Sequence, residues 1–535
     1  MNYLFSFRSA LSLFRAGVVA VSLMCTFLGP LAQAQDLASG IVLKRVEVLG
    51  TTVFSRAEIE DALATVEGQT VYIEDILAMV DRLTGLYVDA GYITSGAVLP
   101  DQDVSDGIVR INIVEGDLTQ ISLTTSGRLN TGYLESKLRQ GLAAPLNLKD
   151  LQRSFSRLEQ ERIVSHVRGE LKPGEQPGES HLVLAVVEEK PWTIRLGADN
   201  YRSPSVGDEQ TSLAAEHLNL LGFNDTLNLG LQHSNGIDSG YVRYEFPVTA
   251  IKSRLAVYHS SGETLVVEAP FNVIDLESET DTTGLTLTTA WRDDARTRVR
   301  TGISYEVKES QTRLLGLPFD FAAGSREGLA EASVIGAFLE YTYKGQRSGF
   351  VLRGGARLGS DENDVPFRVA GDDGDFNLYQ IQADYVVRLG SNTAGSPWLF
   401  GLSVNYQGTS DTLPAFERMA LGGHDSIRGY RENRLLMDSG VAASAELTIP
   451  LLRQNADSDL NLDGLLFADY GRGENSTAAN NVSTDNGISS IGLGFSGDYR
   501  GFRFSLMRAI RFQNKQKLGE TLQDSGIHVG VTYEF

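Results

Sequence analysis

A regular alternation of apolar and polar residues continues from Pro191 to Phe535 and restricts the fold of this chain more than any other feature of its sequence. Residues 226–232, TLNLGLQ, place three leucines on one face and glycine and amide side chains on the other. Successive side chains of a β-strand point to opposite faces, so this two-residue period predicts strands with one apolar and one polar face. The polar, glycine-containing segments between them predict turns and loops of an all-β domain.

Two arrangements satisfy this alternation, namely a membrane β-barrel and a soluble β-sandwich or propeller. Charged side chains on the polar face, such as Arg243, Glu245 and Arg353, favour a barrel with lipid outside and water inside. Short connections also alternate with long ones, which is typical of a barrel with turns on one side of a membrane and loops on the other. We therefore expect a membrane β-barrel of about 16 antiparallel strands over residues 191–535, since about 9–11 residues suffice for each strand to span.

The last predicted strand ends the chain with the letters GIHVGVTYEF. Its apolar face ends on Tyr533 and Phe535, which resembles the terminal signal that bacterial barrel-assembly machinery recognises in outer-membrane proteins. The alternative is an ordinary edge strand that happens to end on an aromatic residue. An even number of strands would return the C-terminus to the side from which the chain enters the barrel.

The first residues of the chain predict export. Arg8 and Arg15 form a basic segment, and residues 16–32 form an apolar segment. Small residues at the end of this run predict cleavage between Ala34 and Gln35. We therefore interpret residues 1–34 as a signal peptide.

A membrane anchor is the alternative to a signal peptide, but Pro30 interrupts the apolar run before the length of about 20 residues that a spanning helix requires. Cys25 is the only cysteine and would be removed with the signal peptide, so the mature chain has no internal disulfide. Removal of the two signal-peptide arginines changes the formal net charge from −21 to −23. A chain this acidic is a poor candidate for binding nucleic acid.

Residues 35–190 differ from the rest of the chain because helical periods occur in them. The segment 41–50 alternates as a strand, Ser55 and Glu58 form a capping box before a helix, and a second helix is predicted from about Tyr72 to Ala90. Two more alternating segments follow. The resulting order, β-α-α-β-β, occurs once in residues 35–116 and again in residues 117–190.

This repeated order resembles that of POTRA domains, which are periplasmic modules that handle polypeptides. Residues 91–116, GYITSGAVLPDQDVSDGIVRINIVEG, are similar to the first POTRA domain of two-partner secretion transporters in their Gly-Tyr, Leu-Pro-x-Gln and Val-Glu-Gly elements. The resemblance implies two POTRA-like α+β domains, at 35–116 and 117–190, before a barrel at 191–535. It also implies an outer-membrane location with the POTRA domains in the periplasm.

Several sequence patterns of enzymes and cofactor sites were considered and set aside. The letters GLGFSG at 492–497 match a dinucleotide loop, but a strand and not a helix is predicted after them. The histidines are scattered and have no cysteine partner, which argues against a transition-metal site. The acidic segment 361–375 lacks the ligand spacing of an EF-hand, and no phosphate-binding GxxxxGK[ST] motif is present. We expect no cofactor and no bound metal.

The segment 421–433, LGGHDSIRGYREN, contains the three residue types of a hydrolase triad. Three consecutive side chains diverge, whereas the members of a triad relay a proton across space. His424, Asp425 and Ser426 are therefore not interpreted as catalytic, and the protein is not expected to be an enzyme.

The same segment carries a different signal when it is paired with residues 467–471, FADYG. Arg-Gly-aromatic and Phe-x-Asp-x-Gly resemble two signatures of the BamA-like superfamily of barrel assembly and secretion proteins, on the sixth surface loop and on the thirteenth strand. The resemblance assigns these signatures to Arg428, Gly429 and Tyr430 in the loop and to Phe467, Asp469 and Gly471 on the barrel wall.

A loop at about 410–436 is long enough to fold into the lumen and form a latch to the wall. There Arg428 can offer its planar guanidinium to Asp469 as a bidentate pair. Gly429 would allow a sharp turn, and Tyr430 is expected to pack against Phe467. If the pair is instead exposed, it contributes only about 0–1 kcal/mol.

Taken together, the resemblances imply a two-partner secretion transporter of the haemolysin- and adhesin-exporting (ShlB/FhaC/HecB) type. Such a protein captures an unfolded partner exoprotein in the periplasm and exports it through the barrel. An insertase that assembles other barrels is the alternative, although such relatives usually carry more POTRA domains. A passive porin would need no POTRA repeat. Only about six residues separate Gln35 from the first predicted strand, so a plug helix before the first domain is not expected.

Overall fold

The computed structural model describes most of the chain after residue 39, and the predicted cleavage site at Ala34 and Gln35 lies outside the described residues. No helix in the described part of the chain has the length and hydropathy needed to cross a membrane. The described ranges are 40–64, 67–248, 252–294, 296–320, 325–361, 375–391, 396–453, 459–476, 487–513 and 519–535.

The chain divides into two compact units. The first contains the described residues up to Ser122, together with Gly141–Gln152 and Glu170–Val183. The second contains Leu123–Gln140, Arg153–Gly169 and Leu184–Phe535.

The N-terminal elements form a small α+β domain around a three-stranded sheet with the order β2-β5-β4. β2 runs parallel to β5, and β4 runs antiparallel to it. α2 begins at the predicted capping box, in which the Ser55 side chain accepts from Glu58 N and the Glu58 side chain accepts from Ser55 N. The elements are β1 (Ile41–Val42), β2 (Arg45–Leu49), α2 (Arg56–Leu63), β3 (Thr70–Val71), α3 (Ile73–Asp89), β4 (Gly96–Val98) and β5 (Ile108–Val114).

Glu115, in the Val-Glu-Gly element that follows β5, links separate segments of this domain through hydrogen bonds. The Glu115 carboxylate accepts hydrogen bonds from Thr52 N at 2.6 Å, Val53 N at 3.1 Å and the Tyr87 hydroxyl at 2.8 Å. Burial alone would raise the pKa of Glu115, but these hydrogen bonds outweigh it and hold the pKa below its usual value. A Cβ atom on Gly116 would lie 2.4 Å from the Thr94 carbonyl oxygen, so only glycine fits there.

The next elements repeat the order β-α-α-β-β, as the sequence predicts. They are β6 (Asp117–Thr125), α4 (Thr131–Arg139), α5 (Leu148–Glu159), β7 (Val164–Pro173) and β8 (Glu179–Glu188). Their sheet has the order β6-β8-β7, so β7 is an edge strand. The division between the two compact units passes through this sheet.

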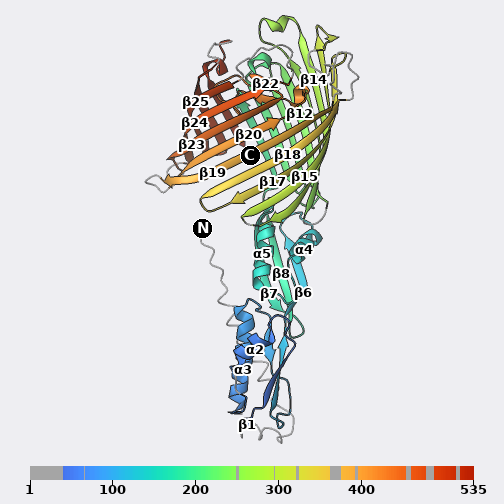
Figure 1. Cartoon of the computed structure of the whole chain (residues 1–535), viewed down its shortest axis with the longest axis vertical. Coiled ribbons are helices and arrows are strands. Elements are labelled where there is room, and N and C mark those ends of the chain that lie inside the picture. Colours follow the sequence, from blue (N-terminus) through green and yellow to red (C-terminus); the bar gives the residue numbers. More distant parts are fainter. Residues whose placement is uncertain are drawn as a thin grey trace. The chain divides into compact units, whose positions relative to one another are not determined.

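The remaining strands close into an antiparallel barrel (Figure 1). In this barrel β9 pairs with both β10 and β27. The described residues form sixteen full strands, because β16 (Leu317–Pro318) only extends the end of β15 while β15 pairs directly with β17. These strands are β9 (Trp192–Asp199), β10 (Gln210–Leu218), β11 (Thr226–Ser234), β12 (Ile237–Pro247), β13 (Ser253–Leu265), β14 (Leu276–Asp293), β15 (Thr297–Leu314), β17 (Leu329–Lys344), β18 (Ser348–Asp361), β19 (Asp375–Ser391), β20 (Pro397–Gly408), β23 (Ser439–Leu452), β24 (Leu460–Glu474), β25 (Gly487–Tyr499), β26 (Phe502–Arg511) and β27 (Ile527–Glu534).

Several strands are longer than the 9–11 residues expected for a membrane span. β14 and β15 each contain 18 residues, and they stay paired along nearly their whole length. Pairing satisfies the backbone N–H and C=O groups at any depth, so a ladder can continue beyond the hydrocarbon region. Some residues that the sequence assigns to long connections therefore belong to the strands.

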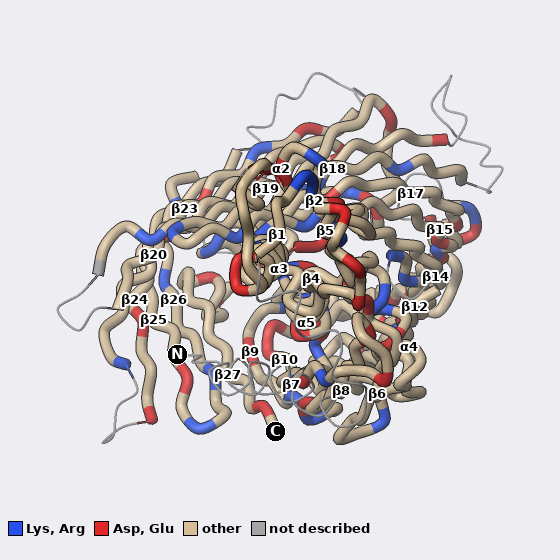
Figure 2. Tube along the Cα trace, turned by 90° about the horizontal axis from the view of Figure 1, so that it is seen from below, with Lys and Arg blue, Asp and Glu red and all other residues tan. Residues whose placement is uncertain are grey.

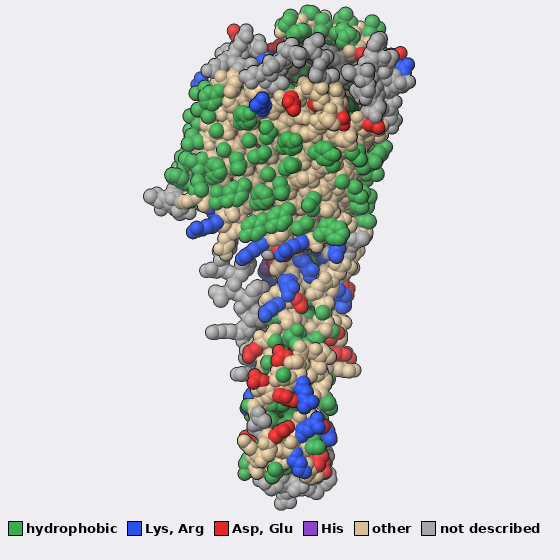
Figure 3. Space-filling view, in the orientation of Figure 1, with side chains coloured by type: hydrophobic (Ala, Val, Ile, Leu, Met, Phe, Trp, Pro, Cys, Tyr) green, Lys and Arg blue, Asp and Glu red, His purple; other side chains and the backbone are tan. Residues whose placement is uncertain are grey.

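The two faces of the barrel strands separate by polarity as predicted. Leu229 and Leu231 of β11 are exposed on the outside, and Figure 3 shows hydrophobic side chains spread over the outer wall. The alternate residues carry the charges: Glu245 pairs with Arg243 on the same strand, β12, and with Arg254 on the neighbouring strand, β13. An apolar exterior and a charged interior are the arrangement of a membrane barrel.

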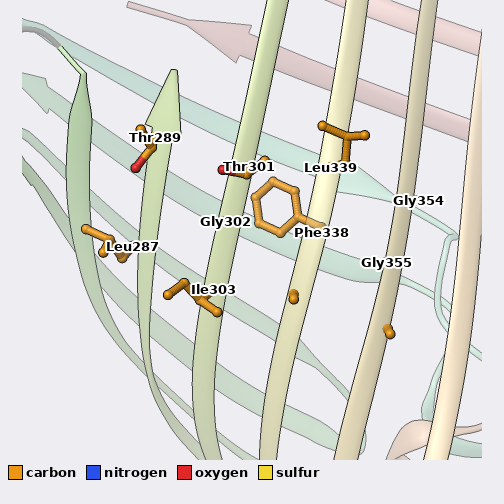
Figure 4. Close-up of a pocket in the computed structure, with 11 residues that line it drawn as sticks. Leu287, Thr289, Thr301, Gly302, Ile303, Phe338, Leu339, Gly354 and Gly355 are labelled. Atoms are coloured by element: carbon orange, nitrogen blue, oxygen red, sulfur yellow. The ribbon is translucent and has the colours of Figure 1, made fainter. Parts of the chain in front are cut away.

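A hollow of about 600 Å³ indents the wall where β14, β15, β17 and β18 lie side by side (Figure 4). Small residues, among them Gly302, Ala337 and Gly354, form part of its lining, together with larger apolar side chains such as Leu287, Ile303 and Phe338. The hollow contains no charged residue, so its lining carries no group suited to acid-base chemistry.

Candidate functional site

The connection between β20 and β23, residues 409–438, folds back into the barrel. β20 and β23 are the eleventh and twelfth full strands counted from β9 in the described chain, so this connection is the sixth at its end of the barrel. We call it the sixth loop. It contains η4 (Ala415–Glu417) and a two-stranded ladder of β21 (Met419–Leu421) with β22 (Leu435–Met437).

Apolar residues near the tip of the sixth loop hold it in place. Leu421, Ile427 and Tyr430 are at most 1 % exposed, and they pack in one cluster with Ala442 of β23 and Ile488 of β25. A loop that projected into water would leave these side chains exposed, so their burial stabilises the inward position.

Arg428 and Asp469 form the predicted bidentate pair. Arg428 Nε lies 2.9 Å from Asp469 Oδ2, and Arg428 Nη2 lies 2.9 Å from Asp469 Oδ1. The Arg428 backbone N–H also donates to Asp469 Oδ2 at 3.0 Å. The Asp469 side chain is fully buried and that of Arg428 is 8 % exposed, so water screens this pair poorly.

The other donors of the Arg428 guanidinium also have partners. Nη1 donates to Glu446 Oε2 at 2.5 Å and lies 3.8 Å from the Met507 sulfur, and Nη2 donates to Ser444 Oγ at 3.0 Å. The guanidinium carbon is 3.6 Å from the centre of the Phe467 ring, which adds a cation–π contact. Every donor of this buried cation is thereby satisfied.

The register of β23 against β24 explains why these partners converge. Ser444 lies opposite Asp469, and Glu446 lies opposite Phe467. A slip of one residue would turn the whole set to the lipid face, so the pairing that aligns the two strands also assembles the receptor for Arg428.

The structure corrects the expected contact between Tyr430 and Phe467. The Arg428 guanidinium covers the face of Phe467, whose apolar cluster consists of Leu465, Met507 and Ala509. Tyr430 belongs to the separate cluster at the loop tip, and its hydroxyl lies 3.0 Å from Ser489 O and 2.9 Å from Gln513 O. The prediction was wrong because a planar cation competes for the same ring face.

Two glycines of the motifs allow the loop to approach the wall. Gly429 has a φ of +93°, and a Cβ atom there would lie 2.7 Å from Ala509 Cβ. The Gly429 N–H donates to His528 Nε2 at 3.0 Å. On the wall, a Cβ atom on Gly471 would lie 2.9 Å from the Ile427 side chain, so its absence makes room for the loop.

His424, Asp425 and Ser426 do not have the geometry of a catalytic relay. His424 Nδ1 is 2.7 Å from Asp425 Oδ1, while its ring stacks on Tyr201 at a centroid distance of 3.7 Å. Ser426 Oγ accepts a hydrogen bond from Gly422 N at 2.9 Å. The hydroxyl is therefore used to shape the loop.

The sequence interpretation missed a second anchor of the sixth loop. Glu417 of η4 is buried and accepts from Lys308 Nζ at 2.7 Å and Arg357 Nη2 at 3.0 Å. Arg357 also pairs with Glu306 at 2.7 Å. The alternation pattern of β15 and β18 indicates that their charged side chains face inward. It does not indicate that these charges pair with Glu417, because that contact depends on the path of the sixth loop.

Of the C-terminal aromatic residues, Tyr533 lies on the last strand, beside the strand that begins the barrel, and Phe535 directly follows that strand. Tyr533 pairs with Leu196 of β9, and its ring centre is 4.5 Å from that of Phe502 and 4.6 Å from that of Phe535. The three rings form one aromatic cluster at the end of the barrel where β27 finishes.

Comparison with known proteins identifies the family. Residues 178–497 match the model of the haemolysin secretion/activation proteins ShlB/FhaC/HecB. The chain belongs to this family. Residues 41–116 also match the ShlB-type POTRA domain.

Named relatives agree with the family. The chain is 27% identical over 434 residues to the outer membrane transporter CdiB of Escherichia coli O6:K15:H31, covering 76% of this chain and 68% of CdiB. It is 22% identical over 450 residues to the heme/hemopexin transporter protein HuxB of Haemophilus influenzae, covering 81% and 76%. Over a shorter stretch of 250 residues it is 28% identical to the hemolysin transporter protein ShlB of Serratia marcescens, covering 45% of this chain and 43% of ShlB.

Solved structures share the fold. CdiB from Escherichia coli superposes with a TM-score of 0.65 at 19% identity, with all of both chains covered. BamA from Haemophilus ducreyi, lacking POTRA domains 1–3, superposes with a TM-score of 0.55 at 14% identity, covering 93% of this chain and 100% of BamA.

The family membership decides between the functions that the sequence left open. The protein is a two-partner secretion transporter of the outer membrane, with POTRA in the periplasm, and it exports a secreted partner protein. The insertase alternative is not supported, because the likeness to BamA is one of fold, whereas the family model and the named relatives are secretion proteins.

Proposed function

We propose that the POTRA domains capture the partner exoprotein unfolded, and that the exoprotein crosses the membrane through the lumen once the sixth loop has moved. The observation that carries this proposal is the position of the loop, which places buried Arg428 against the wall at Asp469. A chain threading through the barrel must pass this obstruction. The loop therefore acts as a latch that keeps the pore closed until the partner arrives.

Ion pairs are suitable contacts for a loop that has to be released from the barrel wall. The loop is tied to the wall by charged pairs at Glu417 and at Arg428. Water entering the lumen with the exoprotein can replace hydrogen bonds of this kind one by one, since the net stability of an ion pair falls as solvent screens it. A seal made only of apolar side chains would offer no such route.

The edge strands are the natural place for capture by strand addition, in which an extended peptide pairs with a free strand edge. In the first domain the edge at β4 is partly closed, because Ala97 N donates to Thr84 Oγ1 at 3.0 Å. In addition, the Gln102 amide bonds to both Arg110 N and Arg110 O at 2.7 Å, beside β4.

The edge strand β7 of the second domain is longer than β4 and more open. β7 contains 10 residues. The Val167 N–H donates to the Glu159 side chain at 3.3 Å, on the side of β7 that faces away from β8. N–H groups of every second residue in a strand point to the same side, so the Leu171 N–H also faces away from β8. We assign capture of the exoprotein to the part of β7 around Leu171.

The same proposal covers the assembly of the barrel, its lipid surroundings and the role of His424 and Ser426. The cluster of Tyr533 and Phe535 acts as the recognition signal for the barrel-assembly machinery, and membrane lipid covers the apolar outer wall. In this proposal the protein acts as a transporter and not as an enzyme, and Ser426 and His424 serve in loop packing.

Deletion of the gene tests the proposed function. We expect one large protein to disappear from the medium while the other outer-membrane proteins keep their levels. Broad loss of barrel proteins from the outer membrane would contradict the proposal and support an insertase. A plasmid copy with intact Arg428 and Asp469 should restore secretion.

A further inference from the structure

The barrel closes at a short seam between its first and last strands, β9 and β27, which lie side by side (Figure 2). Their ladder joins five residue pairs, from Asp199 with Gly530 to Arg195 with Glu534, whereas β9 forms eight pairs with β10 and β27 forms seven with β26. Fewer pairs hold this junction than hold the neighbouring ones. The seam therefore depends more on other contacts.

Asn200 supplies such contacts directly above the ladder. Its backbone N–H donates to Val529 O at 3.1 Å, its Nδ2 donates to Ile527 O at 3.0 Å, and its Oδ1 accepts from Val529 N at 2.8 Å. The side chain thereby continues the pairing of β27 where β9 has ended. Asn200 is 2 % exposed, so solvent does not compete for these hydrogen bonds.

Gln523 connects Asn200 to the sixth loop. Its Nε2 donates to Asn200 O and to Arg202 O, each at 2.5 Å, and its Oε1 accepts from Glu432 N at 3.0 Å. Gln523 lies in η5 (Gln523–Ser525), between β26 and β27, and is fully buried. One amide side chain thus joins the start of the barrel, its last connection and the sixth loop.

Arg431, next to Glu432, strengthens the same junction. Its Nε and Nη2 each lie 2.8 Å from one oxygen of the Asp524 carboxylate, and its Nη1 lies 2.9 Å from Glu268. Asp524 also accepts from Thr521 Oγ1 at 2.9 Å. The Arg431 side chain is 10 % exposed and that of Asp524 is 1 % exposed, so this is a second buried bidentate pair.

We propose that Arg431 is a second positioning residue of the sixth loop, and that it couples the loop to closure of the barrel at the β9–β27 seam. We call the set Asn200, Gln523, Arg431 and Asp524 the seam clasp. Arg428 and Arg431 are only three residues apart, so withdrawal of the loop tip breaks the latch and the clasp together. The inference rests on the proposed movement of the loop, and it adds that this movement loosens the seam.

Hydrogen exchange on the purified full-length protein tests the coupling without requiring secretion. In Arg431→Gln, amides of residues 195–202 and 527–534 should exchange about tenfold faster or more, while those of β24 around Asp469 stay protected. Arg434→Gln is the matched control, because Arg434 lies in the same loop and forms no ion pair among the described residues. Unchanged exchange at the seam in Arg431→Gln, or the same increase in Arg434→Gln, would overturn the proposal.

A disulfide across the seam tests whether its loosening matters for export. Ala198 and Val531 are partners in the ladder and both are exposed, and the native Cys25 lies in the predicted signal peptide. With Ala198→Cys and Val531→Cys together, we expect secretion to fall at least fivefold when oxidised and to recover with reductant, while each single cysteine has no effect. Normal secretion from the oxidised pair would refute a role of the seam in export.

These two experiments separate the inference from the proposed function. If the pair of Arg428 and Asp469 has no role in export, secretion survives Arg428→Ala although Arg431→Gln still exposes the seam amides. That result would overturn the latch and keep the structural coupling. If the seam amides are insensitive to Arg431→Gln, the coupling is wrong even if the latch controls secretion.

Discussion

The Arg428 guanidinium meets the Asp469 carboxylate through two N–H···O contacts of 2.9 Å each, across 41 positions of sequence. Ser444 Oγ also donates to Asp469 Oδ1 at 2.7 Å, so the wall itself supplies one hydrogen bond to the aspartate besides those from the loop arginine. The pair therefore joins a residue of the sixth loop to a residue that the barrel wall also holds. The consequences for export, stability and pH can each be measured.

Arg428→Ala and Asp469→Ala should each leave a barrel in the outer membrane but reduce secretion of the partner. Removing one member of a buried pair strands the other charge, at a cost of about 3–5 kcal/mol, although water in the lumen lowers this figure. Secretion is measured as the amount of exoprotein in the medium, and barrel folding by the heat-dependent shift of the band on a gel. Wild-type secretion by both variants would show that the pair has no role in export, and Arg434→Ala serves as the control.

Gly429→Ala should unseat the loop tip even though the change adds only one methyl group. The φ of +93° is unfavourable for alanine, and the new Cβ would lie 2.7 Å from Ala509 Cβ. We expect a loss of about 1–3 kcal/mol at the loop and faster proteolysis of its tip. The double variant Gly429→Ala with Ala509→Gly removes the steric overlap but keeps the backbone strain, so it should recover only part of the loss. Full recovery would assign the whole effect to the overlap.

Leu171→Pro should reduce capture of the exoprotein, because proline removes the N–H that the open edge of β7 presents to an incoming strand. Leu171→Ala shortens the same side chain but keeps the amide, and it should bind as the wild type does. Binding is measured by crosslinking the full-length transporter to an unfolded fragment of its partner. Equal binding by both variants would exclude this edge as the capture site.

The stability of the first domain should depend on pH through Glu115. Its carboxyl has a lowered pKa in the folded domain, so it stabilises the fold above its unfolded value of 4.5, and this contribution is lost as the pH falls through the lower folded value. Glu115→Gln should therefore cost about 1 kcal/mol near pH 7, since partial exposure screens the carboxylate, and progressively less as the pH falls below 4.5. Exchange of the Thr52 and Val53 amides follows this change. A difference between the two proteins that is independent of pH would contradict the assignment.

Local patterns in the sequence were sufficient for the architecture. The two-residue period sorted Leu229 and Leu231 to the outside and Arg243 and Glu245 to the inside, because strand geometry alone alternates side chains. The capping box at Ser55 predicted the start of α2 for a similar reason, since both partners lie within one helical turn. The pair of Arg428 and Asp469 was predicted because two short motifs of the sequence resemble known signatures of the superfamily.

Contacts between distant segments were decided by the tertiary structure. The position of Phe467 beneath the Arg428 guanidinium, and of Tyr430 near Ser489 and Gln513, follows from how deeply the loop enters the barrel. The pair of Arg431 with Asp524 joins residues 93 positions apart on two different loops. Strand register and loop path set such distances, and neither leaves a periodic trace in the sequence. The chain thus encodes its strands and their faces locally, whereas the residues that hold the sixth loop against the wall are brought together only when the barrel itself closes.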